Sequence, residues 1–120
     1  MITFYWIVAG LAALVFAAAG GMKLARPRAA LQASGMGWVE DFNPGSVKLV
    51  GALEVLGALG LILPALAGTA VVLSPVAGIC LVLVMIGAVV VHIRRKEPFG
   101  APGLLAVFAA VAAILGFIAL

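Results

Sequence analysis

The sequence predicts an all-α, polytopic membrane protein, a bundle of four transmembrane helices in one domain over residues 1–120. Apolar residues make up 67% of the chain and charged residues only 9%, a balance far outside that of soluble domains. The apolar residues fall into long runs, and the Lys and Arg residues gather at the ends of those runs. A bundle packed against lipid is therefore expected rather than a soluble core.

The first helix is predicted over residues 2–22. This run has no charged side chain, and a helix of that length covers the ~30 Å hydrocarbon layer of a bilayer. A secretory signal is the alternative, since the alanines at 17–19 could form a cleavage site. Basic residues follow the run and none precedes it, the reverse of a signal peptide, so we prefer a retained helix.

Two features of this first helix predict its surroundings. Tyr5 and Trp6 stand where an interfacial aromatic belt is expected. Small residues recur at every fourth position and form a ridge that would let another helix approach closely: Ala9, Ala13, Ala17 and Gly21.

The connection that follows, residues 23–46, is less hydrophobic. Pro27 suits the first turn of a short helix, so residues 27–34 are predicted to lie along the membrane surface. Glu40 and Asp41 are neighbours whose side chains would point apart on a regular element, so a solvated loop is expected rather than an acid pair.

The second span is predicted over residues 47–63, with Ser46 as its N-cap and Pro64 at its end. It contains one carboxylate, Glu54, and an ionisable group inside such a run is by default a functional-site hypothesis. Helical spacing places this carboxylate on one face with small residues: Val47, Gly51, Glu54 and Ala58. Glu54 is therefore expected to face other helices.

Two alternatives fit the third span. It is either a long helix kinked at Pro75, or a helix that starts there with Ser74 as N-cap. We prefer the second, residues 75–94, which leaves residues 65–73 as an outer hairpin. A loop rich in proline and glycine then leads to the fourth helix, residues 102–120.

The distribution of basic residues predicts the topology. All seven Lys and Arg residues belong to the first and third connections or to the adjoining helix ends. The positive-inside rule therefore makes the loops at 23–46 and 95–101 cytoplasmic, with both termini outside, in the cytoplasmic (inner) membrane of the cell.

Three polar side chains are expected at similar depth in the cytoplasmic half of the bundle: Lys23, Glu54 and His92. Lys23 ends the first helix on a flexible stem and is the expected partner of Glu54, whose charged form it would favour. Lys48 is the runner-up, but it lies about 240° around the same helix from Glu54 and points elsewhere. The three side chains are predicted to line one polar pocket.

This constellation leaves three interpretations open. Glu54 and Lys23 could form a purely structural clasp between two helices. Glu54 and His92 could instead handle protons beside a bound lipophilic molecule such as a quinone or a lipid. The third interpretation is proton-coupled transport through Glu54.

Other chemistries are less compatible with the composition. One His and one Cys cannot assemble an ordinary zinc site or a bis-histidine haem site, and no catalytic motif is present. No intrinsic cofactor is expected, and an oxidoreductase partner subunit would have to supply any electrons. The net charge is +3, but the basic residues flank hydrophobic spans, a pattern that does not indicate nucleic-acid binding. Small-residue ridges would also allow a homodimer.

Three stretches carry a family resemblance: AAGGMKL at the end of the first helix, KLVGALEVLGALGLILP in the second, and GAVVVHIRR in the third. They resemble the small four-helix DoxX family, especially its DoxX-like branch. The resemblance implies an integral membrane protein, and some members are linked to thiosulfate:quinone oxidoreduction or to membrane oxidoreductase complexes. It singles out Lys23, Glu54 and His92 as the recurring polar positions.

Small multidrug transporters are a useful contrast, because they are similarly short four-helix proteins that depend on a membrane glutamate. In those proteins the glutamate belongs to the first helix, whereas Glu54 lies in the second span here. Transport is therefore the lesser alternative, and the resemblance to the DoxX-like branch implies an accessory or binding module of a membrane redox system.

Overall fold

The computed structural model describes residues 1–120, and all of its regular elements are helices. Four of these helices are long and apolar enough to cross a membrane, as the predicted fold class requires. Two short helices lie between the first and second of them. In chain order the elements are α1 (Ile2–Ala25), α2 (Arg28–Ala33), the 3₁₀ helix η1 (Gly37–Asp41), α3 (Pro44–Ala67), α4 (Leu73–Arg94) and α5 (Gly100–Ala119).

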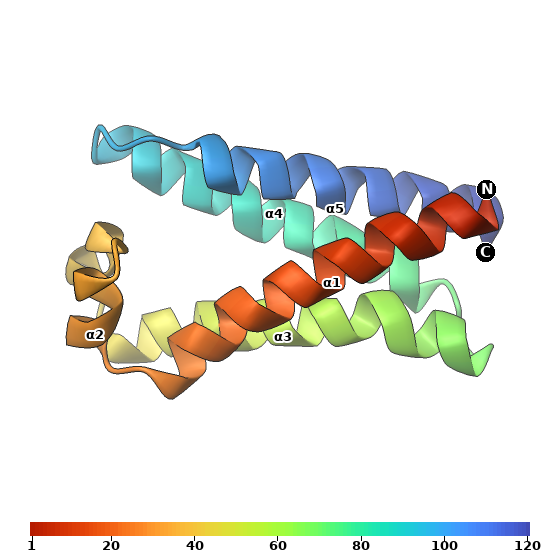
Figure 1. Ribbon diagram of the computed structural model, residues 1–120, viewed down its shortest axis with the longest axis horizontal. Helices are drawn as coiled ribbons and strands as arrows, with labels where there is room; N and C mark the ends of the chain where they lie inside the picture. Colours follow the sequence, from red (N-terminus) through yellow and green to blue (C-terminus); the bar gives the residue numbers. More distant parts are fainter.

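The four long helices form a closed ring. α1 packs against α3 and α5, and α4 packs against the same two helices. Both termini lie at one end of the bundle, and α2 with η1 lies at the other end, beside the α4–α5 connection (Figure 1). We call this second end the basic end. The longest dimension is 40 Å, which matches a bilayer with its headgroup regions, ~40–45 Å.

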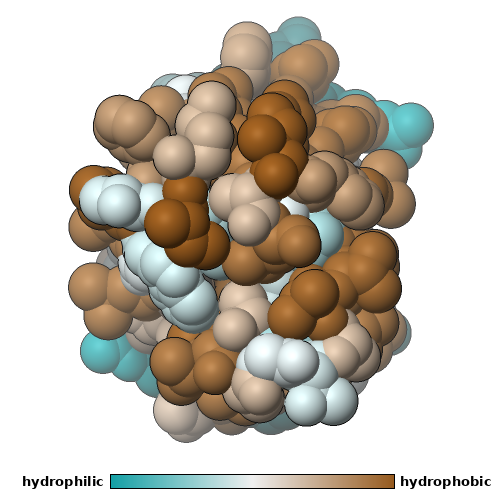
Figure 2. Space-filling view, turned by 90° about the vertical axis from the view of Figure 1, so that its right-hand side faces the viewer, coloured by the Kyte–Doolittle hydropathy of each residue, from teal (hydrophilic) through white to brown (hydrophobic).

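The outer surface is suited to hydrocarbon. Only 25 of 120 residues are buried, and large apolar side chains are exposed along all four long helices. Viewed from the end with the termini, the surface is brown to near-white, with teal only at the rim (Figure 2). Small residues dominate the interior, so the helices approach closely and direct their larger side chains outward.

The face that α1 buries differs from the predicted ridge. Ala9 and Ala13 are buried as expected, but Ala17 is exposed and Gly21 has open space around it. Gly20 is buried instead. Four residues turn an α-helix by about 400°, so a strict four-residue repeat drifts by about 40° at each step and leaves the contact.

Helix α3 continues through Pro64 instead of ending there. A proline lacks an amide donor and crowds the preceding turn, which loosens the local backbone hydrogen bonds. Here the Tyr5 hydroxyl donates to the Leu61 carbonyl oxygen over 2.6 Å, and the Ala65 amide donates to the Ser74 hydroxyl over 3.1 Å. Side chains of α1 and α4 thus bond to the backbone around the proline, which makes it tolerable inside a membrane helix.

Several predicted details near this proline are therefore wrong. Tyr5 is fully buried in the core and does not belong to an interfacial belt. Ser74 is not an N-cap, because α4 begins one residue before it, at Leu73. Residues 65–73 are not an outer hairpin either, since α3 runs to Ala67 and only residues 68–72 connect it to α4.

The start of α3 also differs from the prediction. Asn43 is its N-cap, and Asn43 Oδ1 accepts a hydrogen bond of 2.7 Å from the Ser46 amide. Pro44 occupies the first helical position, where its missing amide hydrogen is not needed. Ser46 is therefore inside the helix.

Replacing Tyr5 by phenylalanine should lower the free energy of unfolding by about 1–2 kcal/mol, because the buried Leu61 carbonyl loses its side-chain donor. Titration with a denaturing detergent, followed by circular dichroism, measures this change. Trp6→Phe is the matched control, since its ring is only partly buried and its indole makes no hydrogen bond. Equal effects of the two substitutions would contradict this role of Tyr5.

Candidate functional site

Two glycines bring α1 and α3 together near the basic end. A Cβ atom added to Gly20 would lie 2.5 Å from the Gly51 carbonyl oxygen, and one added to Gly51 would lie 2.8 Å from the Gly20 carbonyl oxygen. Real Cβ atoms essentially never approach so closely, so the crossing requires glycine on both helices. Lys23 follows Gly20 in the sequence by three residues, about one helical turn, and Glu54 follows Gly51 by the same interval.

An ion pair joins the two helices at this level. Lys23 Nζ lies 2.6 Å from Glu54 Oε1, and the exposed fractions of the two side chains are 9% and 1%. The pairing expected from the sequence is thus present. Lys48 does not compete for the carboxylate, because its Nζ donates to the Leu24 carbonyl oxygen over 2.8 Å.

A cavity of about 490 Å³ adjoins this ion pair. The cavity lies between α3 and α4 near the basic end, where these two helices have separated (Figure 1). Nearer the end with the termini they are in close contact, because small residues meet there: a Cβ added to Gly60 would lie 2.7 Å from the Ala77 Cβ. Leu53 of α3 and Leu83 of α4 line the cavity and are also exposed on the outer surface. The cavity is therefore bordered by side chains that would face lipid.

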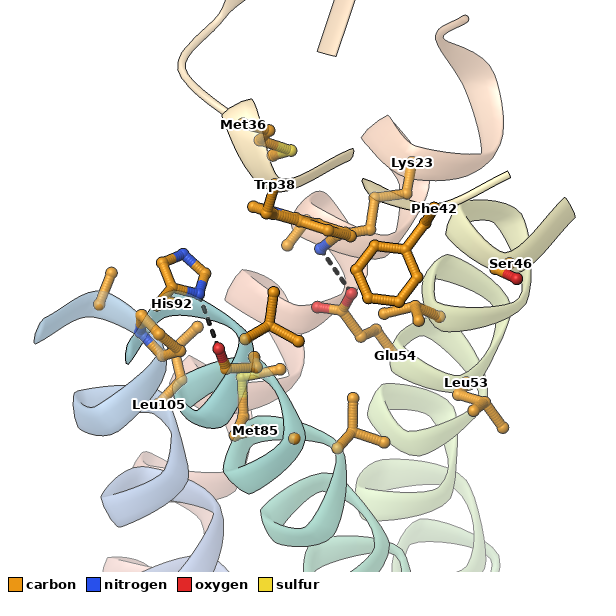
Figure 3. A pocket seen from close by; sticks show the side chains of 18 of the residues that line it. Lys23, Met36, Trp38, Phe42, Ser46, Leu53, Glu54, Met85, His92 and Leu105 are labelled. Carbon is orange, nitrogen blue, oxygen red and sulfur yellow. Dashed lines mark hydrogen bonds and ion pairs between the residues drawn. The ribbon is translucent and has the colours of Figure 1, made fainter. Parts of the chain in front are cut away.

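Besides Lys23 of α1, the cavity wall carries one acidic side chain from α3, Glu54, and one imidazole from α4, His92. Glu54 Oε1 accepts the hydrogen bond from Lys23, whereas Oε2 makes no hydrogen bond within the protein and lies on the side of the carboxylate nearer to His92 (Figure 3). His92 Nδ1 lies 2.7 Å from the Ala88 carbonyl oxygen and donates to it, so Nε2 has no protein partner. No hydrogen bond joins His92 to Glu54 or Lys23. The site thus offers two separate groups able to exchange a proton.

The connection between α1 and α3 covers the cavity at the basic end. Met36, Trp38 and Phe42 all line it, and the two aromatic rings meet edge to face at 5.7 Å (Figure 3). The Trp38 ring lies 5.8 Å from Lys23 Nζ, within range of a cation–π interaction. Met36, Trp38 and Phe42 also pack against a small buried cluster that ties α2, η1 and α3 together: Leu31, Val39 and Val47.

Charged groups attach the cover to the end of α4. The Arg95 guanidinium lies 2.7 Å from oxygens of Glu40, Asp41 and Glu97. Hydrogen bonds to Asp41, Glu40 and Glu97 raise the pKa of Arg95 above its ordinary value, so this cation persists across the accessible pH range. Glu40 and Asp41 are exposed to solvent, as expected. The expectation that their side chains point apart is wrong, because the 3₁₀ helix lets both acids reach one forked guanidinium.

The structure brings two of the three predicted site residues into contact and leaves the third apart. Lys23 and Glu54 are in direct contact, and His92 lines the same cavity without touching them. Their roles in binding or proton transfer remain predictions. Sequence reasoning missed Trp38 and Arg95 as parts of this site, because each acts through a partner more than ten residues away along the chain.

Comparison with family models identifies a match to the DoxX-like family over residues 7–115. Comparisons with curated proteins and with solved structures gave no match. The family match includes Lys23, Glu54, His92 and the whole cavity described above. Because it covers nearly the entire chain, this protein belongs to the DoxX-like family.

Proposed function

We propose that the cavity binds a small lipophilic molecule of the quinone type, and that the protein is an accessory module of a membrane redox system. The observation that supports this most directly is the combination of apolar walls with Glu54 Oε2 and His92 Nε2. Pockets for such molecules typically have volumes of about 300–1,000 Å³ and a few polar groups. The cavity of about 490 Å³ is within this range.

The position of the cavity supports entry from the bilayer. Leu53 and Leu83 line the cavity and are also exposed on the outer surface of the bundle. A lipophilic ligand would therefore reach the cavity between α3 and α4 without crossing water. The polar groups at the basic end would then orient the ligand head, while the apolar walls hold its ring. A bound quinone supplies two-electron, two-proton chemistry.

The residues of this chain would handle the protons. The bond from His92 Nδ1 to Ala88 holds the imidazole ring in one orientation and leaves Nε2 to donate or accept a proton. Lys23 keeps one oxygen of Glu54 occupied, so the carboxylate presents its other oxygen to the cavity. The electrons would come from an oxidoreductase partner subunit. In this proposal the basic end faces the cytoplasm and both termini lie outside.

Trp38 provides the readout for a binding test. In a Trp6→Phe background, a short-chain quinone should quench the fluorescence of Trp38, the remaining tryptophan, which lines the cavity. His92→Ala and Glu54→Gln should each weaken this binding about tenfold, as expected for the loss of one hydrogen bond in an apolar site. Arg94→Gln is the control, because it removes a neighbouring exposed charge outside the cavity.

Unchanged quenching in both variants would overturn the proposal and favour a structural clasp. Uptake driven by a pH gradient in proteoliposomes, lost in Glu54→Gln, would favour the alternative of proton-coupled transport.

A further inference from the structure

The acidic residues of this protein are all engaged. Glu54 pairs with Lys23, and the other three carboxylates converge on Arg95. Of the seven Lys and Arg residues, only Lys23 and Arg95 therefore take part in ion pairs. The remaining cations have no carboxylate to neutralise them: Arg26, Arg28, Lys48, Arg94 and Lys96.

Three of these unpaired cations line a second cavity, of about 360 Å³. Arg26 follows the last residue of α1, Arg28 begins α2, and Lys48 lies in the early part of α3. The fold thus collects three positive side chains from three elements at one place. This cavity shares only Lys23 with the larger one between α3 and α4.

Hydrogen bonds to backbone oxygens position two of the three cations. One guanidinium nitrogen of Arg28 donates to the Phe42 carbonyl oxygen over 2.8 Å, and Lys48 Nζ donates to the Leu24 carbonyl oxygen over 2.8 Å. Each side chain keeps further N–H donors, and Arg26 makes no side-chain hydrogen bond within the protein. The cavity therefore presents several unused donors carrying positive charge.

Apolar side chains adjoin these charges on the membrane side. Leu24 and Leu49 are 40% and 60% exposed, and each lies within two residues of a cation of the group. The charges thus lie where α1 and α3 leave the hydrocarbon layer. An occupant that satisfies both features has a negatively charged head joined to an apolar tail.

We propose that Arg26, Arg28 and Lys48 form a binding site for the phosphate of an anionic phospholipid. Guanidinium groups bind phosphate through paired hydrogen bonds, and an ammonium adds a point charge. Basic pockets at the ends of transmembrane helices recognise acidic lipid headgroups by the same chemistry. The acyl chains lie along Leu24 and Leu49 on the outer surface of α1 and α3.

Native mass spectrometry of the full-length protein in detergent tests the site, with phosphatidylglycerol and phosphatidylcholine as the added lipids. Arg26→Gln/Lys48→Gln should weaken phosphatidylglycerol binding about 25-fold, since each cation near a membrane surface is worth roughly fivefold. Arg94→Gln/Lys96→Gln removes the same charge from exposed residues outside the cavity and should change binding less than about twofold. Thermal unfolding should be similar for both double variants, because all four side chains are exposed and the one hydrogen bond that is lost, from Lys48 to the Leu24 carbonyl oxygen, is exposed as well.

Four results would overturn the site. Equal losses in the two double variants would mean that diffuse charge attracts the lipid, and no loss in either would mean that these cations do not bind it. Displacement of phosphatidylglycerol by millimolar inorganic phosphate would identify a free anion as the occupant. Equal retention of phosphatidylcholine and phosphatidylglycerol by the unmodified protein would also contradict recognition of a negatively charged headgroup.

Discussion

Replacing Glu54 by leucine alone is expected to lower the free energy of unfolding by about 3 kcal/mol, because it leaves Lys23 charged and without its partner among buried groups. The ammonium retains only the Trp38 ring, 5.8 Å away, which is a much weaker partner than a carboxylate at 2.6 Å. Detergent-induced unfolding in mixed micelles measures the change.

The double variant Lys23→Met/Glu54→Leu shows how much of this loss comes from the interaction between the two side chains, apart from their contacts with other residues. Removing both charges should restore most of the lost stability, since apolar side chains of similar size can replace a buried ion pair at little cost. The coupling between the two substitutions should then exceed about 2 kcal/mol. Simple additivity of the single effects would show that the two residues do not stabilise the bundle through each other.

The same double variant distinguishes a structural clasp from a functional site. If the pair serves only packing, the restored bundle should bind the quinone as the unmodified protein does. If Glu54 Oε2 contacts the ligand, the double variant should remain folded and lose the binding reported by Trp38. Stability and binding are thus measured on the same variant. Retained binding would support a structural clasp, and lost binding in a stable protein would support a functional site.

Substituting alanine for Gly20 should lower the free energy of unfolding by about 2–3 kcal/mol, the upper part of the range for adding atoms to a tightly packed interior. The new methyl group would meet the backbone oxygen of Gly51 at 2.5 Å, and backbone cannot move aside as a flexible side chain can. The helices would have to separate, and Lys23 would be drawn away from Glu54. Quinone binding should therefore weaken as well.

The neighbouring glycine is a matched control for this substitution. Gly21→Ala adds the same methyl group one residue further along α1, where no atom lies within 4 Å of the added carbon. It should be neutral or slightly stabilising, because alanine favours a helix over glycine. A similar loss of stability in both variants would place the α1–α3 crossing elsewhere.

Much of the fold follows from local spacing. The four spans were predictable because a bilayer sets the length of an apolar helix, and residues 2–22 differ from α1 mainly at its end. The face of α3 that carries Val47, Gly51, Glu54 and Ala58 is buried as the helical period predicts. The Lys23–Glu54 contact could be expected because both residues lie near the basic ends of adjacent spans.

The predictions failed where a residue depends on a distant partner. Pro64 was expected to end a helix because its neighbours along the same helix offer no replacement hydrogen bonds, yet Tyr5 and Ser74 supply them from α1 and α4. Glu40 and Asp41 were expected to diverge because nothing nearby in sequence draws them together, yet Arg95 does so from the end of α4.

The sequence by itself therefore determined the number of spans, the carboxylate inside the second of them and the end of the bundle where positive charge gathers. These properties depend on hydrophobic length, helical period and charge count, which can be read along one chain. Only the tertiary structure decided that Trp38 and Phe42 cover a cavity and that His92 Nε2 and Glu54 Oε2 line it without touching. The physical reason is that such contacts depend on how closely helices cross and where they separate, and one methyl group at Gly20 or Gly51 is enough to change that distance.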